Sequence, residues 1–115
     1  MRYLLMICLD ETAYAALSPE EAEASMARYG TFYDEMSSRG VLQGGERLRP
    51  TADSTTVRVR DGEVLLTDGP YIEGAEVANG YHILNVADRD EAIKVASMIP
   101  ATTVELRQLM GISGL

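Results

Sequence analysis

The hydrophobic positions near the N-terminus form one unbroken run. Every residue from Tyr3 to Leu9 is apolar, whereas a strand with one wet face would alternate apolar and polar residues. The run therefore predicts a strand that is buried on both faces of a sheet. The acidic pair Asp10 and Glu11 ends it.

A helical pattern follows from Pro19 to Arg39. Ser18 is a suitable N-cap, Pro19 suits the first helical position, and Glu21 completes a capping box. Gly40 supplies the C-terminal stop. Apolar residues recur along one face at spacings of three and four, which is typical of an amphipathic helix. The members of this predicted face are Ala22, Met26, Tyr29, Tyr33 and Met36.

A short strand and a hairpin come next. Residues 41–48 predict a strand broken by Gly44-Gly45. The dipeptide Asp61-Gly62 predicts a two-residue turn because both residues tolerate positive φ. That turn pairs Arg60 with Glu63 and places an apolar row on one face of the hairpin: Val57, Val59, Val64 and Leu66. The same alternation directs Asp68 to this apolar side.

The second half of the chain repeats the strand–helix–strand order. Residues 81–86 predict a strand after a break at Asn79-Gly80, and Asp88 with Glu91 predicts a capped helix ended by Pro100. Residues 103–110 predict the last strand. The order predicts one domain over residues 1–115 with an α+β, ferredoxin-like βαββαβ fold and an inserted β-hairpin. The second helix has its own apolar face: Ala92, Val95, Ala96 and Ile99.

The predicted sheet has more apolar surface than two helices can cover. Residues 3–9 are apolar on both sides, and Ile83 and Leu84 point to opposite sides of their strand. An open face of this kind would leave several hundred Å² of apolar area in water, more than a monomer usually exposes. Either the hairpin folds back over that face or a second copy covers it. Since closed two-fold dimers are the commonest assembly, we predict a homodimer.

The net negative charge of the chain argues against two classes of binding partner. Ten basic against eighteen acidic residues give a net charge of −8, which opposes binding to nucleic acid or to an anionic membrane. Cys8 is the single cysteine and lies in an apolar run, so it is expected to pack as a small hydrophobe. The N-terminus lacks the pattern of a signal peptide. We expect a cytoplasmic location and a small-molecule or protein partner.

Several ordered motifs resemble one known family. The segments TTVRVRDG, TDGPYIE, NGYHILNVADRDEAIKVASMIP and VELRQL are similar to those of the DGPF-domain branch of the YCII-related family. The resemblance implies a ferredoxin-like fold assembled as a dimeric α/β barrel. Some relatives are encoded near sigma factors of the extracytoplasmic-function type, which implies a regulatory role.

The chain departs from this family in two places. Tyr71 stands where the branch has Phe after Asp-Gly-Pro. The broader family is thought to use a His–Asp pair with the His in the first helix, but residues 19–39 contain no histidine. Asp10 would be the matching carboxylate, and its partner is missing. That mechanism is therefore not transferred to this chain.

The stretch TDGPYIE admits two interpretations. In the first it is a turn, in which the Asp68 carboxylate accepts backbone N–H bonds and Gly69 and Pro70 shape the bend. In the second Asp68 is a general base or an orienting carboxylate at a cleft, with Tyr71 as wall or proton donor. Both can hold together, and Glu73 would then rim the cleft.

His82 is the only histidine, and it shares a strand face with Leu84 and Val86. It is either a packed residue or, because its ordinary pKa lies near neutrality, the acid/base partner of Asp68 or Asp10. Tyr29, Phe32 and Tyr33 face either the core or a cleft.

The last strand offers one more candidate. Glu105 and Arg107 lie two apart on one face; they form ion pairs there, or Arg107 binds a substrate carboxylate. No metal-ligand spacing, phosphate loop, dinucleotide fingerprint or nucleophile motif is present, so we expect no metal and no cofactor.

These candidates support two main hypotheses. The first is a dimeric small-molecule-binding enzyme that works by acid/base chemistry, of the isomerase or lyase type, near Asp68. The second is a non-catalytic ligand sensor or regulatory module; a purely structural dimer is a third. The predicted catalytic residues are Asp68, His82 and Tyr71, and the predicted ligand-binding residues are Asp10, Gly69, Pro70, Glu73, Tyr81 and Arg107.

Overall fold

The computed structural model describes residues 1–101 and 103–112, which form a mixed α+β fold. In chain order the elements are β1 (Arg2–Leu9), α1 (Glu11–Ala15), α2 (Pro19–Ser38), β2 (Leu42–Arg47), the 3-10 turn η1 (Thr51–Asp53), β3 (Thr55–Arg60), β4 (Glu63–Asp68), β5 (Val77–Asn85), α3 (Arg89–Ser97) and β6 (Thr103–Gln108).

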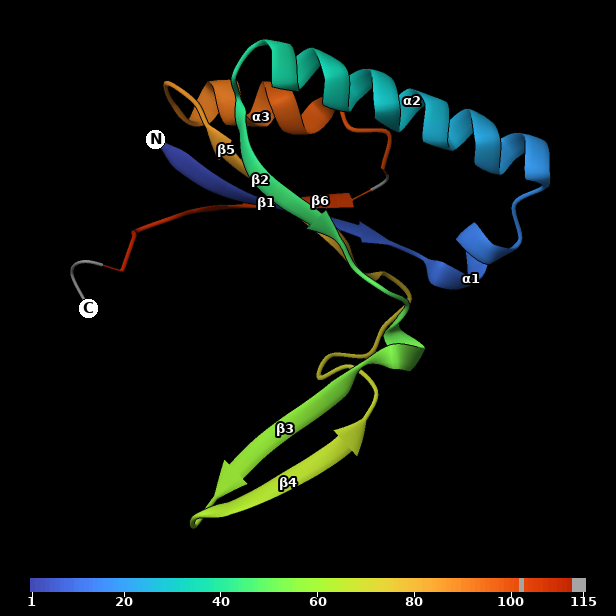
Figure 1. Cartoon of the computed structure of the whole chain (residues 1–115), viewed down its shortest axis with the longest axis vertical. Helices are drawn as coiled ribbons and strands as arrows, with labels where there is room; N and C mark the ends of the chain where they lie inside the picture. Colours follow the sequence, from blue (N-terminus) through green and yellow to red (C-terminus); the bar gives the residue numbers. More distant parts are fainter. Residues whose placement is uncertain (102, 113–115) are drawn as a thin grey trace.

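Four strands form one antiparallel sheet in the order β2-β5-β1-β6. Figure 1 shows α2 and α3 lying along the same side of this sheet. Neighbours in the sheet are not neighbours in the chain, since β1 pairs with both β5 and β6. This order, with both long helices on one face, is compatible with a ferredoxin-like fold.

The core lies between the sheet and the two long helices. Leu5 of β1, Met36 of α2 and Leu84 of β5 are fully buried there. On the other face of β1, Leu4 and Met6 are only partly buried. The apolar run of β1 is thus buried toward the helices, and its second face is left partly open in the single chain.

Helix α2 begins as its sequence predicts. The Ser18 hydroxyl accepts the Glu21 N–H, and the Glu21 carboxylate accepts the Ser18 N–H in return. Gly40 follows the helix with a φ of 70°, a value that favours glycine. Among the described residues, none of the helices combines the length and the apolarity needed to span a membrane.

The predicted buried face of α2 is wrong at two positions. Phe32 is 4% exposed and belongs to the core, whereas Tyr33 is 48% exposed. Met26 is also exposed, because a cavity rather than packed side chains lies beneath the N-terminal half of the helix. The apolar spacing defines a face of α2, but it cannot say which part of that face meets solid core.

Two predicted breaks are β-bulges instead. β2 runs through Gly44-Gly45, with its register shifted between Leu42 and Gly44. β5 runs through Asn79-Gly80 while the register on β1 shifts between Ile7 and Cys8. The ladder hydrogen bonds continue on either side of each shift, so these dipeptides do not end the strands. Gly45 and Gly80 instead allow close packing within them.

The β3–β4 hairpin has the register that its turn predicts and stands apart from the main sheet. Arg60 pairs with Glu63 across a turn in which Asp61 and Gly62 both have positive φ. Figure 1 shows the hairpin projecting away from the helices and the sheet. Its apolar row stays solvated, with Val59 and Leu66 each 68% exposed. The radius of gyration is consequently 16.4 Å, against roughly 13 Å for a compact chain of this length.

Candidate functional site

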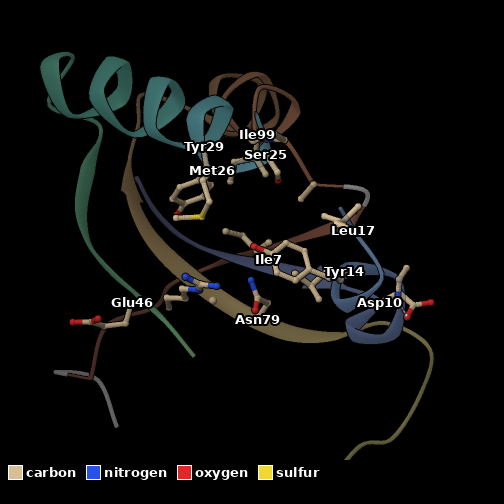
Figure 2. A pocket seen from close by; sticks show the side chains of 16 residues that line it. Ile7, Asp10, Tyr14, Leu17, Ser25, Met26, Tyr29, Glu46, Asn79 and Ile99 are labelled. Carbon is tan, nitrogen blue, oxygen red and sulfur yellow. Dashed lines mark hydrogen bonds between the residues drawn. The ribbon is translucent and has the colours of Figure 1, made fainter. Parts of the chain in front are cut away.

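A cavity of about 350 Å³ opens between the helix-covered face of the sheet and the N-terminal half of α2. In Figure 2, the side chains of Met26 and Tyr29 project from α2 toward the cavity, and Ile7 lies on the sheet below it. Tyr14 and Leu17 lie at one end. Most of its lining is apolar, and it lies within the range of about 300–1,000 Å³ typical of small-molecule sites. This cavity is therefore the candidate site.

The cavity exists because one row of the sheet has a gap in its side chains. Arg47 of β2 pairs with Gly80 of β5, which pairs in turn with Ile7 of β1. Gly80 has no side chain to fill the space under α2, and a Cβ at this position would come 3.0 Å from the Glu46 carbonyl oxygen. The glycine that the sequence suggested as a strand break instead forms the floor of the site.

His82 lies one row further along the same face of β5 and is 5% exposed. Its Nε2 is hydrogen-bonded to the hydroxyl of Tyr29. Three rings from α2 surround the imidazole, with centroid distances of 5.9 Å to Tyr29, 6.3 Å to Phe32 and 6.2 Å to Tyr33. Positions three and four apart share a helix face, so α2 places all three rings over this one strand residue.

Gly45 of β2 makes room for this imidazole. A Cβ at Gly45 would lie 2.4 Å from His82 Nδ1 and 2.5 Å from the Tyr81 carbonyl oxygen. A Cβ at the neighbouring Gly44 would meet nothing within 4 Å. The backbone of β2 therefore holds His82 against α2 at a point where only glycine fits.

Burial favours the neutral forms of both Tyr29 and His82. It lowers the pKa of His82, and a hydrogen bond to the Gly44 backbone acts in the opposite direction. Burial also raises the pKa of Tyr29. Both shifts favour neutral groups. The direction of the Tyr29–His82 hydrogen bond depends on the tautomer of the ring. In the neutral tautomer with its proton on Nδ1, Nε2 accepts from the Tyr29 hydroxyl.

This charge state predicts a pH dependence of stability. Between the lowered pKa of folded His82 and the ordinary value of about 6.5, the unfolded chain binds more protons than the folded chain. The free energy of unfolding should therefore fall as the pH drops below about 6.5, with a slope of at most about 1.4 kcal/mol per pH unit from this residue. Urea unfolding from about pH 5.5 to 7.5 measures it. His82→Gln should lack this component, and equal slopes in both proteins would contradict the assignment.

A second hollow of about 460 Å³ adjoins the first. It lies toward η1 and is bounded by Glu11, Arg49 and Pro50. The Glu11 carboxylate ties this region together by accepting from the Thr51 N–H and hydroxyl at 3.0 and 2.9 Å. The two hollows have four residues in common: Leu9, Tyr14, Arg47 and Asn79.

The predicted residues of the Asp-Gly-Pro motif lie on the hairpin and not at this cavity. Asp68 is exposed at the end of β4 and pairs with Thr55. Gly69, with a φ of 109°, donates its N–H to the Ser54 carbonyl at 2.8 Å. Among the described residues no backbone N–H donates to the Asp68 carboxylate, so the backbone of Gly69 closes the hairpin base.

The residues that follow this turn are also outside the cavity. Tyr71 is 73% exposed, and the Arg58 guanidinium lies 5.5 Å from the centre of its ring. Pro70 is half-buried and Glu73 is exposed. His82 is thus brought together with Tyr29 and Gly44, while Asp68 and Tyr71 lie on the hairpin side.

Three other predicted residues have different settings. Asp10 lines the cavity and caps α1, a helix not predicted from the sequence, by accepting the Ala13 N–H at 3.0 Å. Tyr81 and Arg107 lie on the helix-free face of the sheet, since they neighbour Met6 and Leu4 in the ladder. Arg107 is paired with Glu105 of the same strand at 2.8 Å.

Two cavity residues had no distinguishing signal in the sequence. Tyr14 lies on α1, a helix too short for a clear period. Arg47 ends β2 and was indistinguishable from other surface arginines. The sequence identified Tyr29 as an aromatic residue of the long helix. It could not identify His82 as its hydrogen-bond partner, because the two residues are 53 positions apart in the chain.

Comparison with known proteins places the whole fold within one group. A family model described as the YCII-related domain matches residues 1–111. An uncharacterized protein of Rhizobium meliloti (strain 1021) is 32% identical over 96 residues, which covers 84% of this chain and 77% of that protein. Neither description states an activity, so the function has to be argued from the cavity.

Proposed function

Because the chain belongs to the YCII-related family, whose function is unsettled, we propose from the site itself that this protein binds a small, largely apolar molecule under α2. The observation that carries the proposal is Tyr29, which lines the cavity and whose hydroxyl is hydrogen-bonded to a buried histidine. A hydroxyl that donates to a neutral imidazole presents its oxygen lone pairs to whatever enters the cavity.

The same pair supports acid/base chemistry on the bound molecule. In the proposed step, the Tyr29 oxygen takes a proton from the ligand while the Tyr29 proton passes to Nε2 of His82. The reverse transfer returns a proton to another position of the ligand, which is an isomerisation. Tyr29 is the catalytic residue because it contacts the ligand, and His82 acts through it as a positioning residue and proton store.

The alternative function is ligand sensing without turnover. The raised pKa of Tyr29 and the lowered pKa of His82 both oppose a charged tyrosinate–imidazolium pair, so the neutral pair is well suited to simple binding. A regulatory role linked to an extracytoplasmic-function sigma factor belongs to this alternative.

We also propose that the chain falls in the DGPF-domain branch of the family. This assignment rests on the sequence Asp68-Gly69-Pro70 after the hairpin.

The proposed assembly is a homodimer of the dimeric α/β-barrel type, in which a second copy covers the helix-free face of the sheet. Leu4 and Ile83 are partly exposed neighbours on that face. The exposed hairpin supports the same conclusion, because an isolated two-stranded hairpin is marginally stable in water. Catalytic roles for Asp68 and Tyr71 are proposed only for this dimer, where packing of the hairpin against the second copy would bring them to a cavity.

Thermal shift with a panel of small aromatic and aliphatic metabolites tests the binding function. We expect compounds that raise the melting temperature of the wild type to lose at least about tenfold in affinity in Tyr29→Phe, because the hydrogen bond from ligand to hydroxyl is gone. Tyr33→Phe is the matched control, since Tyr33 is a half-exposed tyrosine of the same helix that does not line the cavity. Conversion of a bound compound, followed by NMR, separates the enzyme from the sensor. A panel without any stabilising compound would contradict both.

A further inference from the structure

Arg47 is the one cationic side chain among the described residues that line the cavity. It ends β2 on the helix-covered face, opposite Gly80, and it borders both hollows. Its position is therefore at the junction of the two hollows.

The Arg47 guanidinium has no carboxylate partner among the described residues. The ion pairs there use Arg39, Arg49 and Arg107 instead. Its charge nevertheless reaches the site, because it acts against burial to lower the pKa of Tyr29. An unpaired guanidinium beside an apolar cavity is a ready partner for an anionic ligand group.

The acidic residues of the lining do not neutralise this charge. The Asp10 carboxylate is engaged at the N-terminus of α1, where it accepts the Ala13 N–H. Figure 2 shows the Glu46 side chain directed away from the other labelled residues of the cavity. The other residues of the lining are apolar or uncharged, among them Ile7, Met26 and Ile99.

From this arrangement we propose that the ligand is a small organic acid with an apolar, preferably aromatic, body. Its carboxylate binds Arg47 at the junction of the two hollows, its body fills the space between Ile7 and Met26, and a hydroxyl or amine at its inner end donates to Tyr29. This inference rests on the proposed binding function and adds the chemical class of the ligand. A planar guanidinium accommodates a carboxylate in two parallel hydrogen bonds, which a neutral group cannot reproduce.

The test compares matched acids and amides. Benzoate, phenylacetate and 4-hydroxybenzoate are titrated against the wild type by NMR at physiological salt, each beside its neutral amide. We expect each acid that binds to do so at least about tenfold more tightly than its amide, or about 1.4 kcal/mol. In Arg47→Gln the acid and the amide should bind about equally.

Arg39→Gln is the control variant. It removes the same charge from the C-terminal end of α2, from a half-exposed guanidinium that is paired with Glu35 at 2.5 Å and lines neither hollow, and it should keep the preference for acids. Equal binding of acid and amide by the wild type would overturn the role of Arg47 and leave the cavity proposal intact. An equal loss of preference in Arg47→Gln and Arg39→Gln would also overturn it, because a diffuse charge effect would then explain the result. Failure of all three acids to bind the wild type would overturn the proposed ligand class, while the thermal-shift panel separately decides whether the cavity binds a small molecule.

Discussion

Gly45→Ala is expected to lower the free energy of unfolding by about 3 kcal/mol, the upper end of the usual cost of overpacking. The added methyl group would lie 2.4 Å from His82 Nδ1 and 2.5 Å from the Tyr81 carbonyl oxygen. The imidazole has little freedom to move away, because three aromatic rings of α2 and the Tyr29 hydroxyl surround it. The carbonyl belongs to the ladder between β2 and β5, so it cannot move without loss of pairing.

The matched control is Gly44→Ala on the same strand. Within the single chain, open space surrounds the position that its methyl group would take, so its effect on the stability of the fold should stay within about 1 kcal/mol. Urea unfolding followed by circular dichroism measures both variants, since the chain contains no tryptophan. Similar losses in the two variants would mean that His82 is not confined by β2, and the hydrogen bond to Tyr29 would then lack its structural support.

The second large expected effect concerns assembly. At micromolar concentration the protein should sediment with twice the 12.5 kDa mass of the chain. Ile83→Glu should reduce this mass to that of the single chain, because it places a charge in the middle of the helix-free face, between Leu4 and Gly44. A carboxylate buried at an interface without a partner costs several kcal/mol.

Ile93→Glu provides the comparison. Ile93 is 41% exposed on α3, in the helix layer, so the same substitution there should leave the dimer intact. A wild-type protein that sediments as a single 12.5 kDa species would overturn the proposed assembly. It would also remove the route by which Asp68 and Tyr71 reach a cavity, while the Tyr29–His82 site within one chain would be unaffected.

Short-range sequence signals predicted the local structure well. Ser18 with Glu21, Asp88 with Glu91 and the turn at Asp61 all have the predicted geometry. Each of these features depends on residues within four positions of one another, so the chain needs no knowledge of its tertiary structure to specify them. The alternation along β5, which buries His82 with Leu84, was equally local.

Glycines inside strands were the main source of error. Gly44-Gly45 and Asn79-Gly80 resemble turn dipeptides, and the sequence-based prediction broke a strand at each. The structure uses both as close contacts within continuous strands, where Gly45 faces the His82 ring and Gly80 forms the cavity floor. The sequence contains the glycines but not the side chain that will lie opposite each of them, and only that side chain distinguishes the two uses.

The candidate site was predictable in its parts and not in its arrangement. His82 and Tyr29 were each recognisable as polar groups among apolar neighbours, but their hydrogen bond joins residues on different elements. The Asp-Gly-Pro motif was conspicuous, and it lies on a hairpin that stands away from the cavity. A motif in the sequence shows which residues are candidates for a site. Only the packing of α2 against β5 determines that Tyr29 and His82 lie close enough to form one.

The row Arg47–Gly80–Ile7 has a further implication for how such a domain diversifies. The depth of the cavity at this point depends on the absence of a side chain at Gly80. A Cβ there would come 3.0 Å from the Glu46 carbonyl oxygen, so a larger residue can reduce the cavity only if the backbone of β2 gives way by a few tenths of an ångström. The volume available to a ligand is therefore coupled to the pairing of β2 with β5, and the two are not free to change independently at this position.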